Sequence, residues 1–292
     1  MKSLIIGMGI GNLYKNVLTK LGHEIVTVDI DPNKNADYIN VENALADHVC
    51  FNTAHICTPN FTHETIARQI AEHCGIVFIE KPGVKSALDW SMLTQNYINT
   101  RFMMVKNNMW RNNIIELADH ASKAETVNIR WIRRNCIPYP GSWFTTRELA
   151  YGGVSRDLMP HLLSLYIALN PNWEQESISG KAAMSFWQLK DIDSTDYGTI
   201  NYQGVYNVDD KCYFDFGKKW ACRADWRSMN QEDSSIEFIF KDKSSLKFEL
   251  GWCPEEAYYN MIVDALENIS NTNFWNNQFK QDIWIHQQIE SL

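Results

Sequence analysis

The chain has 292 residues, of which 45% are hydrophobic and 21% are charged, and its formal net charge is −8. This composition is that of a folded protein long enough for two domains, and it excludes a mainly disordered chain. The acidic balance argues against a general surface for nucleic acid or anionic membrane, since both need clustered cations.

Two further observations bear on where the protein works. No stretch reaches the roughly 18 to 20 apolar residues that a membrane-spanning helix needs, and the first residues run directly into a short strand, so we expect neither a membrane span nor a secretory signal. The seven cysteines are scattered and never spaced as C-x-x-C. We therefore expect reduced thiols, no metal site and a cytoplasmic location.

From the N-terminus to about Val105, apolar runs alternate with segments of helical spacing. Short buried strands joined by crossover helices predict a parallel, doubly wound sheet. Only a turn fits between Asp31 and Tyr38, so one crossover helix is predicted to be missing or vestigial. The candidate strands are Leu4–Ile6, Ile25–Val28, His55–Cys57, Ile76–Ile79 and Phe102–Val105.

A glycine turn follows the first strand, with glycines at Gly7, Gly9 and Gly11, whereas a G-x-G-x-x-G turn would place the third at Asn12. Such a turn lets backbone N–H groups approach a pyrophosphate at the start of a helix. Asp29 ends the second strand, where an acid accepts hydrogen bonds from ribose hydroxyls and repels a 2′-phosphate. The pattern favours NAD over NADP, with Lys34 the only close compensating cation. A turn that binds no nucleotide is the alternative.

From about residue 125 the apolar period changes to two. In "SIEFIFKDKSSLKFEL", residues 235–250, the apolar residues predict an antiparallel hairpin with one covered face around the turn Asp242–Ser245. Helical spacing returns over Ser155–Leu169 and from Pro254 onward, so the second half is predicted to be α+β. We place the domain boundary between residues 121 and 122, giving domains 1–121 and 122–292. The apolar hairpin positions are Ile236, Phe238, Phe240, Leu246, Phe248 and Leu250, and the C-terminal helical ones are Tyr258, Ile262, Ala265, Leu266 and Ile269.

Two motifs carry a family resemblance. In residues 55–82, Thr58-Pro59 is followed by His63, a helix, a strand and Glu80-Lys81-Pro82. In "GGVSRDLMPH", residues 152–161, the pattern GG-x-x-x-D-x-x-x-H is matched by Gly152, Gly153, Asp157 and His161. Together with the glycine turn, these motifs resemble the Gfo/Idh/MocA oxidoreductase family, which includes glucose-fructose oxidoreductase and inositol dehydrogenase.

The resemblance covers essentially the whole chain and implies its architecture and activity. The expected fold is an α/β, Rossmann-like N-terminal domain followed by an α+β domain with a large, mostly antiparallel open sheet. The expected reaction interconverts a secondary alcohol and a ketone on a sugar, sugar nucleotide or cyclitol, by hydride transfer to or from NAD, with NADP less favoured. The open sheet face is expected to form a homodimer or homotetramer. Aligned back from "LGHEIVTVD", Gly11 becomes the third glycine of a turn shortened by one residue between Gly9 and Gly11.

The resemblance also implies roles for individual residues. Lys81 would lie beside the nicotinamide and orient substrate or relay a proton. Asp157 and His161 would face the substrate, and spacing of four residues places both on one helix face. A neutral imidazole suits an alcohol proton near pH 7, so His161 is the expected base. The implied cofactor contacts are Gly7, Gly9, Ile10, Gly11, Asn12, Asp29, Thr58, Pro59, Asn60, His63, Glu80 and Lys81, with His63 expected mainly to brace its loop.

Substrate contacts are expected from Lys81, Asp157, His161 and three further residues. Trp143 could stack on a sugar ring and Arg147 could bind a hydroxyl or an anion, each weighed equally against simple packing. Asn108, with Arg111, resembles the polar residues that follow a late strand in the family. Two alternatives stay open: a non-catalytic, nucleotide-sensing regulator of the same fold, and a reductase acting on a non-sugar substrate.

Overall fold

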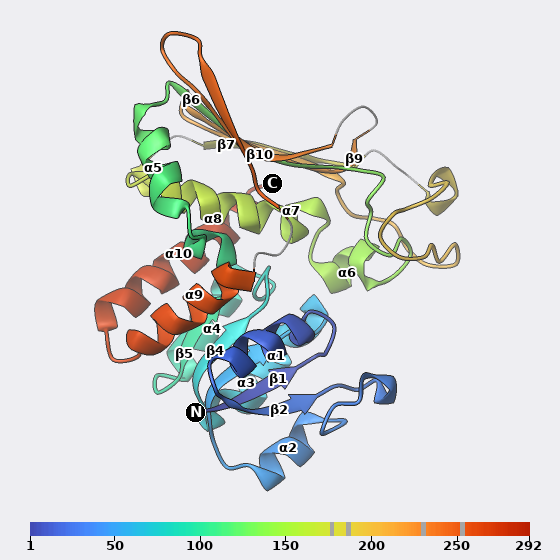
Figure 1. The fold of residues 1–292 in the computed structure, drawn as a ribbon. Helices are drawn as coiled ribbons and strands as arrows, with labels where there is room; N and C mark the ends of the chain where they lie inside the picture. The colour runs from blue at the N-terminus through green and yellow to red at the C-terminus, as the bar shows by residue number, and fades with distance from the viewer. Residues whose placement is uncertain (176–177, 185–187, 229–231, 252–254) are drawn as a thin grey trace. The chain divides into compact units, whose positions relative to one another are not determined.

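The computed structural model describes residues 1–175, 178–184, 188–228, 232–251 and 255–292. The chain divides into two compact units that are discontinuous in sequence (Figure 1). The first unit joins Met1–Val105 to Glu255–Gln287, and the second joins Lys106–Pro254 to Gln288–Leu292. Among the described residues, no helix is both long and apolar enough to span a bilayer.

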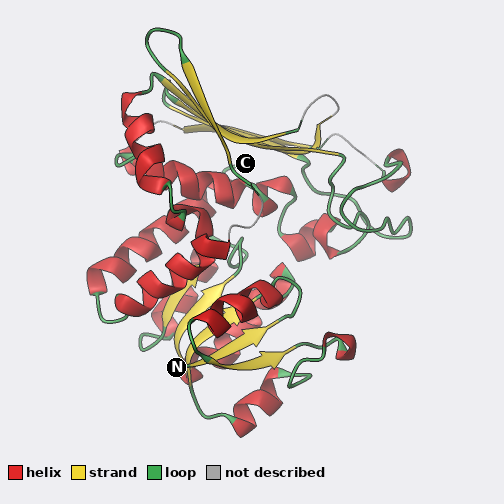
Figure 2. Cartoon of the chain, in the orientation of Figure 1, coloured by secondary structure: helices red, strands yellow, loops and turns green. Residues whose placement is uncertain are grey.

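The first unit is built on a five-stranded parallel sheet, as predicted (Figure 2), and its strands lie in the order β2-β1-β3-β4-β5. Its central strands are almost entirely buried, which explains why they read as continuous apolar runs. The strands are β1 (Lys2–Ile6), β2 (Glu24–Val28), β3 (Phe51–Ile56), β4 (Cys74–Ile79) and β5 (Arg101–Met104).

The crossover between β2 and β3 is short and displaced rather than missing. The turn from Pro32 to Lys34 is a single 3₁₀ turn, Tyr38 bridges back to Val28, and the helix α2 (Val41–Asp47) follows. Asn40 caps α2 by accepting a hydrogen bond from the Asn43 N–H at 2.9 Å. The other helices of this unit are α1 (Gly11–Lys20), α3 (His63–Ile70), α4 (Ala87–Asn96), α9 (Glu255–Glu267) and most of α10 (Thr272–Glu290).

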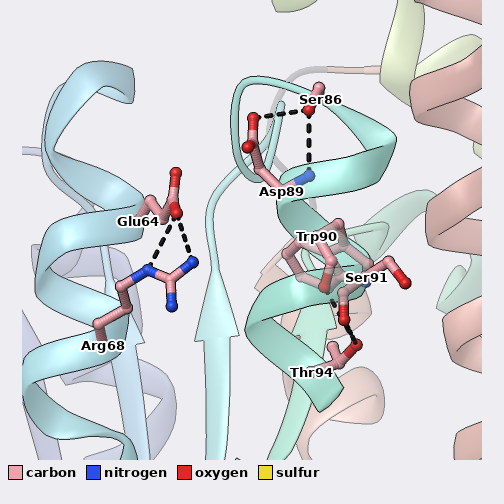
Figure 3. Close-up of polar contacts among 7 residues, drawn as sticks. All are labelled: Glu64, Arg68, Ser86, Asp89, Trp90, Ser91 and Thr94. Atoms are coloured by element: carbon pink, nitrogen blue, oxygen red, sulfur yellow. Dashed lines mark hydrogen bonds and ion pairs between the residues drawn. The ribbon is translucent and has the colours of Figure 1, made fainter. Parts of the chain in front are cut away.

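Local side-chain contacts support α3 and fix the start of α4 (Figure 3). Arg68 donates two hydrogen bonds to Glu64, one turn earlier on α3. At the start of α4, the Asp89 N–H donates to Ser86 Oγ at 3.0 Å, and the Ser86 hydroxyl donates to the Asp89 carboxylate at 2.6 Å. Trp90, in the first turn of α4, is fully buried. The cap therefore fixes where the turn after β4 ends.

The second unit contains a six-stranded sheet in the order β11-β10-β6-β9-β8-β7, antiparallel except for the β6–β9 pair. The predicted hairpin is confirmed, with Ile236 opposite Phe248 and Phe238 opposite Leu246. Leu246 is exposed, so the covered face does not reach the hairpin tip. The strands are β6 (Thr126–Arg134), β7 (Ile178–Ala183), β8 (Lys211–Phe216), β9 (Trp220–Ser228), β10 (Asp233–Ile239) and β11 (Ser245–Glu249).

Helices α5 (Ile114–Lys123), α7 (Val154–Asp157) and α8 (Met159–Leu169) lie along one face of this sheet (Figure 1). The single helix predicted from Ser155 to Leu169 is wrong in one respect, because it is interrupted at Leu158. Pro160 has no N–H to donate to the carbonyl of Arg156, which breaks the ladder there. At the C-terminus, Ile269 was placed on the helical pattern but lies beyond the end of α9 and is exposed.

Candidate active site

The glycine turn of the first unit has the geometry of a shortened dinucleotide fingerprint. Gly7 has a φ of +91°, and a Cβ there would lie 2.7 Å from the carbonyl oxygen of Cys57. A Cβ on Gly11 would lie 2.9 Å from Ile5 Cγ2, so Gly11 supplies the close helix–strand contact expected of a third glycine. A Cβ on Gly9 would meet nothing within 4 Å, which leaves open space beside the middle of the turn.

The start of α1 offers hydrogen-bond donors beside that open space. Within the described chain, no hydrogen bond is found from the N–H groups of Gly9, Ile10 or Gly11. Unsatisfied N–H groups at a helix N-terminus attract an anion, and the helix dipole adds to this. The Asn12 side chain donates to the Met8 carbonyl at 2.5 Å and so braces the turn. The turn can therefore hold a pyrophosphate with backbone groups.

Asp29 joins the end of β2 to this turn. Its carboxylate accepts the Met8 N–H at 2.6 Å and the Asp31 N–H at 2.8 Å, one on each oxygen. A carboxylate has roughly four lone-pair sites, so two acceptor positions remain for a ribose diol. Lys34, the candidate compensating cation, is exposed on the 3₁₀ turn that follows. The arrangement suits an adenosine ribose without a 2′-phosphate.

The Glu80-Lys81-Pro82 turn leaves the carboxyl end of β4. Glu80 is buried, and its carboxylate accepts a hydrogen bond from the Tyr14 hydroxyl at 2.7 Å and from the Lys81 N–H at 3.2 Å. The Lys81–Pro82 peptide bond is cis. Glu80, expected among the cofactor contacts, thus braces the backbone that carries Lys81, while the Lys81 residue itself is half-buried.

His63 links that turn to the Thr58-Pro59 loop. The fully buried imidazole lies with Nδ1 2.7 Å from the Gly83 carbonyl oxygen and Nε2 2.8 Å from the Thr58 carbonyl oxygen. Burial lowers the pKa of His63, while the hydrogen bonds with Gly83 and Thr58 oppose that shift. The Thr62 hydroxyl donates to Thr58 Oγ1 at 2.7 Å, and Asn60 begins the intervening 3₁₀ turn. His63 is therefore placed to brace the loop.

In the second unit, Asp157 and His161 both project toward the sheet. The Asp157 carboxylate accepts a hydrogen bond from Trp226 Nε1 at 3.0 Å, and the His161 ring packs 5.5 Å from the Trp131 ring. Trp131 pairs in register with Ala224, two residues before Trp226, so the two indoles lie on one sheet face. Despite the break in the helix, the carboxylate and imidazole thus lie over the same face, each half-exposed.

Asp209, which the sequence did not point to, holds the start of this motif. Its buried carboxylate accepts the N–H groups of Gly153 at 2.9 Å and Ser155 at 2.8 Å, and the Ser155 hydroxyl at 3.0 Å. A Cβ on Gly153 would lie 1.8 Å from the Asp209 carbonyl oxygen. The second glycine of the motif is therefore required by the close approach of Asp209, which is the one sequence signal of this contact.

The remaining expected substrate contacts lie on short helical segments of the second unit, Trp143 and Asn108 on 3₁₀ turns and Arg147 at the start of α6 (Arg147–Ala150). The Trp143 ring stacks on Phe144 with centroids 3.8 Å apart, and Arg147 is exposed while its Nε donates to the Asn207 carbonyl at 3.2 Å. Asn108 is 1% exposed and its Oδ1 accepts from Arg111 Nε at 2.8 Å. This buried contact holds the Asn108 side chain beside Arg111.

No protein-family model matches the chain. Among curated proteins, it is 28% identical over 215 residues to the "Putative UDP-kanosamine synthase oxidoreductase subunit" of Amycolatopsis mediterranei. That match takes in 69% of this chain and 51% of the other protein, so it spans about half of the relative's length.

Solved structures match over nearly the whole chain. GenD2 from gentamicin A biosynthesis, in complex with NAD, matches with a TM-score of 0.74 and 17% identity over 99% of this chain and 92% of its own. Levoglucosan dehydrogenase, in complex with NADH and levoglucosan, matches with a TM-score of 0.73 and 14% identity, over 100% of this chain and 97% of its own. The myo-inositol dehydrogenase of Corynebacterium glutamicum matches with a TM-score of 0.70 and 13% identity, over 99% of this chain and 94% of its own. The chain has the fold of these dehydrogenases.

That fold is the one expected from the Gfo/Idh/MocA resemblance, so the predicted fold class is confirmed. The predicted residues divide between the units: the glycine turn, Asp29, His63 and Lys81 belong to the first, and Asp157 and His161 to the second.

Proposed function

We propose that the chain is an NAD-dependent oxidoreductase that interconverts a secondary alcohol and a ketone on a sugar, sugar nucleotide or cyclitol. The observation that carries the proposal is the half-exposed Asp157–His161 pair over one sheet face, on a fold that also contains an open glycine turn ending at Asp29. A carboxylate and an imidazole over one sheet face can serve proton transfer. The dehydrogenases that share the fold include complexes with NAD and NADH.

The first unit would hold the cofactor. The N–H groups of Gly9, Ile10 and Gly11 would receive the pyrophosphate, and Asp29 would receive the adenosine ribose. The Thr58-Pro59 loop and Lys81 would flank the nicotinamide, at the carboxyl ends of β3 and β4, where ligands bind in parallel sheets. Bound NAD would supply the hydride acceptor, and the protein would supply orientation and a proton path.

The second unit would supply the proton acceptor. His161 would take the proton from the substrate hydroxyl as the hydride leaves the same carbon, and would return it in the reverse direction. Asp157 would hold the adjacent part of the substrate and stabilise the imidazolium that forms. The Trp226 hydrogen bond fixes which way the Asp157 carboxylate faces. The Lys81 ammonium would orient the reacting oxygen through a charged hydrogen bond.

We also propose a preference for NAD over NADP. Asp29 is half-buried at the end of β2, and its carboxylate would repel a 2′-phosphate placed beside it. Lys34 is exposed, so solvent and salt screen its charge, and it compensates little for the repulsion between Asp29 and a 2′-phosphate. The ratio of the NADH and NADPH dissociation constants, measured by fluorescence, tests this preference.

The uncovered face of the second sheet is the surface that we propose for a homodimer or homotetramer. None of the described helices of the second unit lies on it (Figure 1). Its side chains pair within the sheet, Arg130 with Glu237 at 2.8 Å and Arg223 with Asp215 at 2.6 Å. Sedimentation equilibrium tests the proposal, and a monomer at micromolar concentration would contradict it.

Turnover tests the proposed function. NAD is incubated with myo-inositol, levoglucosan, free hexoses and UDP-sugars in turn, and NADH is followed by absorbance; the matching ketones are tested with 4-deuterated NADH for deuterium transfer. We expect one of these classes to be oxidised, with loss of at least about 100-fold in kcat/KM for His161→Ala. If NADH binds but no class is turned over or labelled, the nucleotide-sensing regulator becomes the better account.

A further inference from the structure

The C-terminal helix α10 contacts the turn that carries Lys81, within the first unit. A Cβ built on Gly83 would lie 3.0 Å from His286 Cε1, 3.1 Å from His286 Nε2 and 3.2 Å from Met104 Sδ. Gly83 has a φ of +79°, and both Gly83 and His286 are buried. The imidazole of His286 therefore lies directly against the backbone two residues after Lys81, in a space that only glycine leaves open.

His286 is itself held on several sides. Its Nδ1 lies 2.7 Å from the Asp282 carbonyl oxygen, and its ring stacks on Trp90 with centroids 5.6 Å apart. Asp282 is fully buried, and its carboxylate accepts the Met104 N–H at 3.2 Å, at the end of β5. The imidazole is thus fixed relative to both α4 and the sheet.

Other helices also contact the same turn. His63, at the start of α3, lies 2.7 Å from the Gly83 carbonyl oxygen, and Tyr14 on α1 donates to the Glu80 carboxylate at 2.7 Å. The Gly83 N–H also donates to the Glu80 carbonyl at 2.9 Å. Three helices therefore constrain residues 80–83, and Pro82 and Gly83 are buried while Lys81 is half-buried.

A buried imidazole and a buried carboxylate are expensive where an apolar side chain would pack as well. Their presence on α10 suggests that the position of the turn matters beyond stability. A group that works beside a reacting atom must be held within a fraction of an ångström, since a misplacement of about 1 Å can cost about 100-fold in rate.

We propose that His286 is a positioning residue for Lys81, acting from the C-terminal helix through the backbone of Gly83. This inference rests on the proposed function, which places Lys81 beside the nicotinamide. His286 and His63 hold the turn from two sides, so the Lys81 ammonium meets the cofactor and substrate in one orientation. The C-terminal segment is on this account part of the catalytic apparatus of the first unit.

A double-mutant cycle tests the proposal with NADH as the probe. Wild type, Lys81→Ala, His286→Leu and the double variant are compared for the dissociation constant and the emission spectrum of bound NADH, which reports the surroundings of the nicotinamide. We expect His286→Leu to shift the emission in the same direction as Lys81→Ala and to weaken binding about threefold to tenfold. In the Lys81→Ala background, the same substitution should change binding by less than about twofold.

Controls separate positioning from stability. His286→Asn retains an N–H donor for the Asp282 carbonyl and should restore most of the wild-type emission. Ile285→Val, at the neighbouring buried position of α10, should lower the melting temperature and leave the emission unchanged. If His286→Leu does not fold, His286→Phe replaces it in the cycle, because it removes the ring nitrogens and keeps a planar group beside Gly83, and the same emission shift and non-additivity with Lys81→Ala are expected.

The outcomes distinguish this inference from the proposed function. If wild type shows no saturable NADH emission, the proposed function fails. If wild type binds NADH but the Lys81 and His286 effects are additive, or Ile285→Val gives the same emission shift as His286→Leu, the positioning role is overturned and the proposed function stands.

Discussion

Trp226 donates its indole N–H to the carboxylate of Asp157 at 3.0 Å, which ties the proposed acid–base motif to the central strand β9. A hydrogen bond to a charged group contributes about 1.5 to 3 kcal/mol. Loss of the donor removes one contact that orients the carboxylate, without altering the glycine turn of the first unit.

Replacing Trp226 by Phe is therefore expected to lower kcat/KM by about tenfold while the NADH dissociation constant stays within about twofold. Steady-state assays with the preferred sugar measure kcat/KM, and fluorescence titration measures the NADH dissociation constant. Trp275→Phe is the matched control, because Trp275 is also buried and also donates its indole N–H, to the Asn268 carbonyl at 2.9 Å. Equal losses of turnover in the two variants would mean that the Asp157 contact has no special role.

Gly9 and Gly11 should respond oppositely to alanine. A Cβ on Gly11 meets Ile5 Cγ2 at 2.9 Å, so Gly11→Ala should destabilise the fold by about 1 to 3 kcal/mol, measured by denaturant unfolding. A Cβ on Gly9 meets nothing within 4 Å, so Gly9→Ala should unfold like wild type but bind NADH at least about tenfold more weakly, because the methyl group enters the pyrophosphate space. Tight NADH binding by Gly9→Ala would show that the phosphates lie elsewhere.

Asp29 should set cofactor choice. Asp29→Asn keeps one acceptor oxygen and removes the charge, so NADH binding should weaken about tenfold and the preference over NADPH should shrink by more than that. Competition titrations with both cofactors measure the ratio. Asp31→Asn, two residues further on and on the same loop, is the control, and an unchanged ratio in Asp29→Asn would remove Asp29 from cofactor recognition.

His55 should make the protein sensitive to acid. Burial, with a smaller effect of His23, lowers the pKa of His55 from 6.5 to about 3. Above pH 6.5 the ring is neutral in both states; below it, the unfolded chain binds a proton that the folded chain excludes. The free energy of unfolding should therefore fall by up to about 1.4 kcal/mol per pH unit as pH decreases below 6.5.

Urea unfolding of wild type and His55→Phe between pH 7.5 and 5 measures this slope. Phenylalanine preserves the stack on Phe78, because the His55 and Phe78 ring centroids are 4.9 Å apart and the ring planes differ by 2°. The slope should be reduced in His55→Phe and retained in His73→Phe, where the wild-type histidine bonds only an exposed carbonyl. Parallel slopes in wild type and His55→Phe would show that His55 is not the group responsible.

The sequence predicted the sheet of the first unit well, because buried parallel strands are short and continuously apolar. The family resemblance, aligned back from "LGHEIVTVD", also predicted that Gly11 makes the close helix–strand contact, and a Cβ there would lie 2.9 Å from Ile5 Cγ2. The sequence pattern missed the interruption at Leu158, where the apolar pattern continues through Pro160 and hides the lost hydrogen bond. The half-exposed Asp157 and His161 nevertheless lie over the same sheet face. Their four-residue spacing does not by itself produce this, because it depends on the register between β6 and β9, which puts Trp131 and Trp226 on one face.

The contacts that brace the site were largely beyond sequence reasoning. Asp209 and Gly153 meet only through the fold, and Asp209 has no motif of its own. His286 is a lone histidine on a helix, which ordinarily indicates nothing. Its place against Gly83 follows from the return of residues 255–287 to the first unit, a discontinuity that a linear pattern does not reveal.

The most direct test of the central claim is a fluorescence titration of the purified chain with NADH, followed by displacement with NAD. We predict saturable energy transfer from tryptophan to NADH with a dissociation constant in the micromolar range, displacement by NAD, and a loss of affinity of at least about tenfold in Gly9→Ala. Absence of saturable binding at millimolar NADH, in protein that unfolds cooperatively, would contradict the account.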